Sequence, residues 1–236
     1  MTARQTAPIE LYYWPTPDGV KAAIMLEELG VPYGIRFVDI GRGDHHAADF
    51  MAVSPGGELP AIVDPEGPDR KSISVAGSGP VLRYLARKFD RFYPAEERAR
   101  TVVDEWLAWQ VGSLGPMLAQ YGHFTRFAAQ HLPYAVKRYA VEAHRLYDVL
   151  NRRLEGRAYV AGDYSIADIA IFAWARRLDA QDIDRDEFPN VARWIDRIAA
   201  RPAVQHALAI EAPRPGGADR QARAFLLGQR AAAGGR

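Results

Sequence analysis

The sequence predicts two parts, a small α/β domain followed by an all-helical domain. Short apolar runs bounded by turn residues alternate with helical stripes in the first part of the chain. From about residue 97 onward, apolar residues recur at helical spacing only. A length of 236 residues, 48% of them hydrophobic, is enough for two modest domains with a core each.

The first part is expected to run β-α-β-(α)-β-β-α. A turn at residues 16–19 leads into a helix whose stripe includes Leu26 and Leu29, and Gly30 is placed to end that helix. A strand, a helix and a strand in succession are what a right-handed parallel crossover requires. A short helix near residues 47–51 and a helix opened by Ser78-Gly79-Pro80 complete the unit. The expected strands are 9–13, 33–38, 61–63 and 72–75.

The second part is expected to be helical throughout. A helix from about residue 97 to 118 should bend or break at Gly112, Gly115 and Pro116. A long amphipathic helix follows Pro133, a capping box at residues 165–168 opens an apolar helix, and two more helices begin at prolines. The boundary is expected near residues 93–95, giving domains 1–92 and 96–210. The Gly-, Pro-, Ala- and Arg-rich segment 211–236 is expected to be a mobile tail.

Composition excludes several classes of function. A formal net charge of +1 gives no general attraction for nucleic acid or an anionic membrane. No apolar run approaches the roughly 20 residues of a membrane span, and residues 1–8 lack a signal core, so a cytoplasmic protein is expected. The absence of cysteine removes disulfides, thiolate metal sites and cysteine-based redox catalysis. Any thiol chemistry must therefore use a thiol brought by a ligand.

Several segments together carry a resemblance to a known family. They are Tyr-Trp-Pro-Thr-Pro-Asp-Gly (13–19), Ser-Pro-Gly-Gly-Glu-Leu-Pro-Ala-Ile-Val-Asp (54–64), Ser-Gly-Pro-Val-Leu-Arg-Tyr-Leu-Ala (78–86), the stretches around Trp109-Gln110 and Leu132-Pro133, and Asp-Tyr-Ser-Ile-Ala-Asp (163–168). From about Ile9 to Leu208 the chain resembles glutathione transferases, most closely the bacterial Nu class. The resemblance implies a thioredoxin-like domain plus an all-α domain, a homodimer, glutathione as cosubstrate, and no metal. It also implies reduction of small disulfides or peroxides.

The resemblance assigns the glutathione site residue by residue. Thr16 would donate its hydroxyl to the thiolate, which lowers the thiol pKa. Leu59, before a cis Pro60, would pair with the tripeptide backbone, and Ser78 at its helix start would hold a carboxylate. Arg138 would face the cleft. The plainer alternatives are a trans Pro60 that starts a strand, a Ser78 that only caps its helix, a solvated Arg138, and core roles for the neighbouring Tyr12 and Tyr13.

Four positions depart from the family pattern. Asp18 replaces an asparagine, and its charge would oppose a nearby thiolate unless it is simply a turn or N-cap residue. Gly77 replaces a glutamate that would meet the ligand's ammonium, and Glu58 replaces a lysine that would meet a carboxylate. At about 5 Å and an effective dielectric near 20, each such interaction is on the order of 3 kcal/mol, and less when exposed. His45 replaces a glutamine and is either a donor or a surface histidine.

Two hypotheses follow from the resemblance and its departures. The first is a glutathione-dependent transferase or reductase, with His123 and Phe124 either lining the electrophile side of the cleft or merely packing. The second is a non-catalytic or retuned binding module on the same scaffold. Asp18 and Glu58 discriminate between them, because glutathione should bind poorly if both carboxylates point into the cleft.

Overall fold

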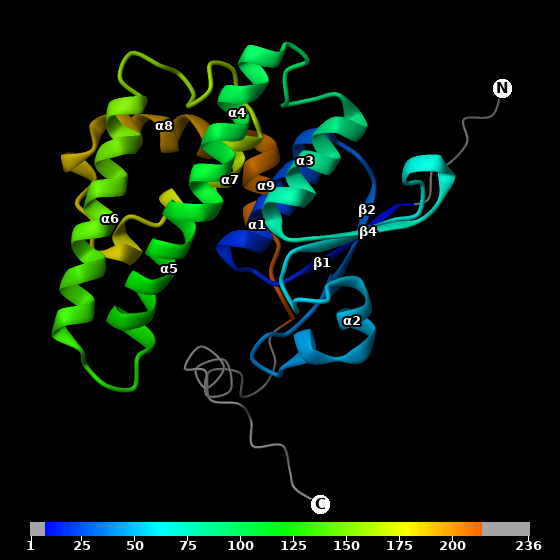
Figure 1. The fold of residues 1–236 in the computed structure, drawn as a ribbon, viewed down its shortest axis with the longest axis horizontal. Coiled ribbons are helices and arrows are strands. Elements are labelled where there is room, and N and C mark those ends of the chain that lie inside the picture. Colours follow the sequence, from blue (N-terminus) through cyan, green and yellow to red (C-terminus); the bar gives the residue numbers. More distant parts are fainter. Residues whose placement is uncertain (1–7, 214–236) are drawn as a thin grey trace, which may run out of the picture.

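A computed structural model describes residues 8–213, so the part of the expected tail from residue 214 onward lies outside the described range. The first part of the chain contains a four-stranded mixed sheet in the order β2-β1-β3-β4 (Figure 1). β1 pairs with β2 in parallel, as the predicted crossover requires, and β3 runs antiparallel to both of its neighbours. The strands are β1 (Ile9–Tyr13), β2 (Tyr33–Phe37), β3 (Ala61–Asp64) and β4 (Ile73–Ala76).

Helices cover both faces of this sheet. α1 and α3 lie between the sheet and the helical part, and α2 lies on the opposite face (Figure 1). α1 begins at Pro17 rather than after a four-residue turn, because Thr16 caps it and proline suits the first helical position. Gly30 ends α1 with φ +66°, as expected. The bounds are α1 (Pro17–Leu29), α2 (Ala48–Val53) and α3 (Ser78–Phe89), with 3₁₀ turns at Asp44–His46 and Pro68–Arg70.

The second part is helical, as predicted. The expected interruption is a π-helical segment, Gln110–Leu114, between α4 and α5. Pro116 has no N–H to continue the α-helical ladder across this point, which accounts for the wider turn. A second π-helical segment, His123–Phe127, ends α5. The helices are α4 (Glu97–Trp109), α5 (Gly115–Gly122), α6 (Pro133–Arg153), α7 (Ile166–Ala175), α8 (Pro189–Ala199) and α9 (Pro202–Leu208), with 3₁₀ turns at Asp179–Gln181 and Arg185–Glu187.

The apolar helix α7 lies at the centre of the molecule and contacts both parts. The predicted capping box is present: the Ser165 hydroxyl accepts from the Ala167 N–H, and the Asp168 carboxylate accepts from the Ser165 N–H. Asp168 also accepts from the Val160 N–H and from the Trp194 indole. α7 packs on α1, α3 and α4, and α9 packs on α1, so one continuous core runs through both parts.

Candidate functional site

Two adjoining pockets form a cleft between the sheet domain and the helical part. The Ser78 pocket, of about 440 Å³, lies over the start of α3 and includes Lys21, Glu58, Gly77, Ser78 and Gln110 in its walls. The Trp14 pocket, of about 550 Å³, lies between the β1–α1 turn and α5. The residues that line both pockets are Asp18, Leu59, Ala119 and Trp174. A ligand seated in one pocket can therefore reach the other.

A buried lysine organises the floor of the Ser78 pocket. The Lys21 ammonium donates to Asp18 Oδ1 at 2.6 Å, to Gln110 Oε1 at 2.7 Å and to Ser78 Oγ at 3.2 Å. These three bonds occupy all three of its donors. Burial lowers the pKa of Lys21, and the adjacent Asp18 carboxylate opposes that shift. Lys21 thus joins α1, α3 and the π-helical segment Gln110–Leu114 through one charge.

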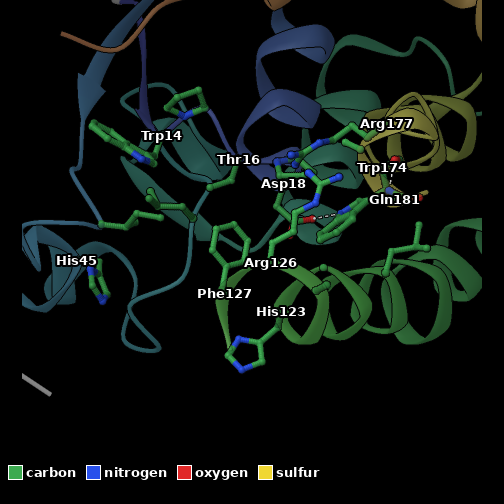
Figure 2. Close-up of a pocket in the computed structure, with 18 of the residues that line it drawn as sticks. Trp14, Thr16, Asp18, His45, His123, Arg126, Phe127, Trp174, Arg177 and Gln181 are labelled. Carbon is green, nitrogen blue, oxygen red and sulfur yellow. Dashed lines mark hydrogen bonds between the residues drawn. The ribbon is translucent and has the colours of Figure 1, made fainter. Parts of the chain in front are cut away.

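Asp18 is a paired carboxylate at the junction of the two pockets. Its Oδ1 accepts from Lys21, from the Trp174 indole at 3.2 Å (the dashed line in Figure 2) and from the Ser78 hydroxyl at 3.4 Å. The alternative that Asp18 is an N-cap or turn residue is wrong, because Thr16 is the cap and Asp18 lies in the first turn of α1. Its Oδ2 accepts no hydrogen bond from residues 8–213. Asp18 therefore lines the cleft as expected, but with Lys21 balancing its charge.

The β1–α1 turn fixes the position of the Thr16 hydroxyl. Its Oγ1 accepts from the Gly19 N–H at 3.1 Å, so its proton is left to donate into the Trp14 pocket. A Cβ on Gly19 would lie 2.1 Å from the Trp14 carbonyl oxygen, so the turn requires glycine there. Tyr13 is fully buried in the core, and burial raises the pKa of its phenol. Tyr13 is thus no substitute for Thr16.

The segment before β3 presents an open peptide edge. The Leu59–Pro60 peptide bond is cis, as the resemblance implies, so the trans alternative is wrong. Ser54 holds the loop, because its hydroxyl accepts from the Glu58 N–H and donates to the Glu58 carbonyl. Leu59 lines both pockets, and its own N–H and C=O have no hydrogen-bond partner within the described range. A peptide ligand can pair with that edge as an added strand does.

The start of α3 faces the Ser78 pocket. The alternative that the Ser78 hydroxyl only caps its own helix is wrong, because Gly77 is the N-cap and the hydroxyl turns to Lys21 and Asp18. Gly77 has φ +87° and ψ 139°, a region that is essentially restricted to glycine. Glu58 is exposed, and its Oε2 lies 3.9 Å from where a Cβ on Gly77 would be. Unlike Asp18, Glu58 faces the cleft without a cation partner among residues 8–213.

The remaining predicted residues lie in different surroundings. His45 is not a surface residue: it is buried in the wall of the Trp14 pocket, and desolvation lowers its pKa. His123 lines that pocket, whereas Phe124 does not and stacks on Tyr139 with ring centroids 5.4 Å apart. Arg138 is exposed, lies 3.8 Å from Glu142, and lines neither pocket.

Several pocket residues were not predicted from the sequence. Lys21 could have been found from the sequence, because it is a charged residue beside the apolar Ala22 and Ala23 on the buried stripe of α1. The others come from elements that only the fold brings together, and they gave no comparable signal. They are Gln110 in the Ser78 pocket, and Trp14, Arg126, Phe127, Trp174, Arg177 and Gln181 in the Trp14 pocket (Figure 2).

Comparisons with known proteins agree with this architecture. Residues 19–88 match the family model "Glutathione S-transferase, N-terminal domain", and residues 116–202 match "Glutathione S-transferase, C-terminal domain". The chain is 45% identical over 202 residues to the disulfide-bond oxidoreductase YfcG of Escherichia coli K12, covering 85% of this chain and 94% of that protein. The chain therefore belongs to the glutathione transferase family.

Solved structures give the same result. A glutathione transferase family member from Pseudomonas fluorescens pf-5, with two glutathione molecules bound, superposes with a TM-score of 0.84 at 40% identity, covering 89% of this chain and 96% of that one. A glutathione transferase from Pseudomonas putida, with one glutathione disulfide bound per subunit, gives a TM-score of 0.84 at 39% identity, covering 89% and 95%. The predicted fold, a thioredoxin-like domain plus a helical domain, is confirmed.

The described part of the chain has neither a membrane-spanning helix nor a cluster of metal-binding side chains. Within residues 8–213, no helix is both long and apolar enough to cross a membrane. The same residues contain no cluster of three or more histidine, aspartate and glutamate side chains arranged to hold a metal ion.

Proposed function

We propose that this protein is a glutathione-dependent disulfide oxidoreductase of the Nu class, working as a cytoplasmic homodimer with domains 1–92 and 96–210. The observation that supports this most directly is the placement of Thr16. Its hydroxyl, with a proton to donate, lies on the Trp14 pocket one turn from the Lys21–Asp18–Ser78 network of the adjoining pocket. A tripeptide bound in the Ser78 pocket would bring its thiol toward that hydroxyl.

The γ-glutamyl end of glutathione has partners of suitable charge in this assignment, whereas the glycyl end does not. The γ-glutamyl carboxylate would lie at the first N–H groups of α3, where the helix carries partial positive charge, and the Ser78 hydroxyl would turn from Asp18 to donate to it. The ammonium would contact Asp18 Oδ2, so that Asp18 takes over the role of the acid that Gly77 lacks. The Leu59 peptide would pair with the cysteinyl main chain. Glu58 faces the glycyl carboxylate and weakens binding at that end.

The chemistry requires two glutathione molecules for each disulfide. The Thr16 hydroxyl donates to the first thiolate, which favours the ionised nucleophile. That thiolate attacks one sulfur of the substrate disulfide, forms a mixed disulfide and releases one substrate thiolate, which takes up a proton. A second glutathione thiolate then attacks the glutathione sulfur of the mixed disulfide, releasing the second substrate thiol and glutathione disulfide. The substrate is reduced by two electrons, and two glutathione thiols are oxidised.

The relatives favour an enzyme over a non-catalytic binding module. YfcG is named a disulfide-bond oxidoreductase, and the structure from P. putida holds glutathione disulfide. The Asp18 charge, which favoured the binding-module hypothesis, is balanced by Lys21 in this chain. Of the two carboxylates that line the pockets, Asp18 and Glu58, Glu58 is the one without a cation partner among residues 8–213.

Calorimetric titration with reduced and oxidised glutathione tests binding, and a glutathione-coupled disulfide assay tests turnover. Thr16→Ala should lower kcat for disulfide reduction strongly and leave glutathione affinity within a few-fold. Thr16→Ser keeps the hydroxyl and is the matched control, so it should retain most of the rate. Failure of the wild-type protein to bind either form of glutathione would overturn the proposed function. Equal rates for Thr16→Ala and wild type would remove Thr16 from the mechanism.

A further inference from the structure

Two arginines in the Trp14 pocket have no role in the mechanism described so far. Arg126 comes from the π-helical segment His123–Phe127, and Arg177 follows the end of α7. In Figure 2 both side chains reach into the pocket, and their guanidinium groups lie near one another. Neither guanidinium forms an ion pair with a carboxylate of residues 8–213.

The two like charges repel one another, and because both residues are exposed, water weakens that repulsion. Partial desolvation lowers the pKa of Arg177 first, and the positive charge of Arg126 lowers it further. Both groups stay protonated, because an arginine keeps its charge under all ordinary conditions. Among the described residues, the carboxylate that lines this pocket is Asp18, whose hydrogen-bonded oxygen is already shared with Lys21 and Trp174. Two adjacent guanidinium groups without a counter-ion are a ready partner for a carboxylate, which each can bind bidentately.

The rest of the pocket wall is largely apolar. Trp14 and Trp174 lie on opposite sides of Thr16 in Figure 2, and Ile40, Leu118 and Phe127 add further apolar surface. Apolar walls around a few placed polar groups are typical of small-molecule sites. The composition suits a substrate with a hydrophobic body and one anionic group, and the Thr16 hydroxyl opens onto the same space.

We propose that Arg126 and Arg177 form a carboxylate clamp that selects, as the second substrate, an organic disulfide with a carboxylate on an apolar body. This inference rests on the proposed function, because it names the substrate class of that same cleft. The clamp anchors the carboxylate and so holds the disulfide near the glutathione thiolate. The clamp binds the disulfide substrate and does not contact the glutathione in the Ser78 pocket.

A matched pair of substrates tests the clamp. One is diphenyl disulfide with a para carboxylate on each ring, and the other is the corresponding neutral diamide, which has nearly the same shape. Reduction by glutathione is followed by coupling glutathione disulfide formation to glutathione reductase. For the wild type, kcat/KM should be about tenfold or more higher for the diacid, the usual scale of a charge-assisted contact. Arg126→Gln and Arg177→Gln should each lower kcat/KM for the diacid far more than for the diamide and so remove most of that preference.

Arg176→Gln is the matched control. This substitution removes the same charge at the same end of α7, but Arg176 lines neither pocket. The preference for the diacid should therefore persist in that variant. Arg177→Lys keeps the charge without the planar fork and should retain part of the preference. Circular dichroism and the thermal midpoint check that each variant folds.

A binding measurement keeps the clamp testable even without turnover. Calorimetry with the diacid and the diamide reports the same charge preference in wild type and variants. If neither disulfide is reduced but the diacid binds more tightly through Arg126 and Arg177, the proposed function fails and the clamp stands. If both are reduced with equal kcat/KM, or the variants keep the preference, the clamp is wrong and the proposed function stands.

Discussion

Replacing Lys21 with methionine should destabilise the protein more than its single charge suggests. The Lys21 side chain is 1% exposed, and its ammonium bonds to Asp18, Gln110 and Ser78. Removing one partner of a buried ion pair costs about 3–5 kcal/mol. Because the Asp18 side chain is 39% exposed and can regain water, we expect the lower end, about 3 kcal/mol. For a chain of this size that corresponds to a thermal midpoint lower by roughly 6–12 °C.

Denaturant unfolding of wild type and variant measures this free energy directly. Lys71→Met is the matched control, because Lys71 is exposed and forms no ion pair with residues 8–213. Combining Lys21→Met with Asp18→Asn should cost less than the sum of the two single changes, with a coupling of about 0.5–3 kcal/mol. A Lys21→Met variant that is as stable as Lys71→Met, or strict additivity in the double variant, would refute the reasoning.

Three further predictions concern a buried acid, an exposed acid and a glycine. Burial raises the pKa of Asp168 from 3.8 to about 6, so between these values the native protein holds a proton that the unfolded chain has released. The free energy of unfolding should therefore fall as pH rises from about 4 to 7, and urea titrations should show that this fall is absent from Asp168→Asn. Glu58→Lys should strengthen glutathione binding severalfold at low salt in calorimetry, with Glu58→Gln intermediate, since exposed pairs contribute about 0.2–1 kcal/mol. Gly77→Glu should instead cost about 1–3 kcal/mol of stability because of its φ of +87°, and a variant as stable as wild type would contradict that.

The order of elements and the fold could be predicted from the sequence because each element carries its own local pattern. The apolar spacing of α1, the capping box before α7 and the prolines that open α8 and α9 are all visible without tertiary information. The cis bond at Pro60 followed only from the family resemblance, because local sequence does not determine it.

The electrostatics of the site could not be predicted in the same way. The sequence predicted that the Asp18 charge would oppose a thiolate. Nothing near Asp18 in the sequence indicates that the Gln110 side chain binds Lys21 or that the Trp174 side chain binds Asp18. Those partners are 89 and 156 residues away in the chain from the groups that they bind. Arg126 and Arg177 likewise lie on separate elements and share a pocket only in the folded chain.

The hydrogen bond from Trp174 to Asp18 ties the cleft to the interior of the helical domain. Trp174 belongs to α7, the helix that the Asp168 capping box anchors. Cutting the chain between the two domains would separate Lys21 from Gln110 and Asp18 from Trp174. The isolated sheet domain would then retain the peptide edge at Leu59 but lose the framework that orders its charges.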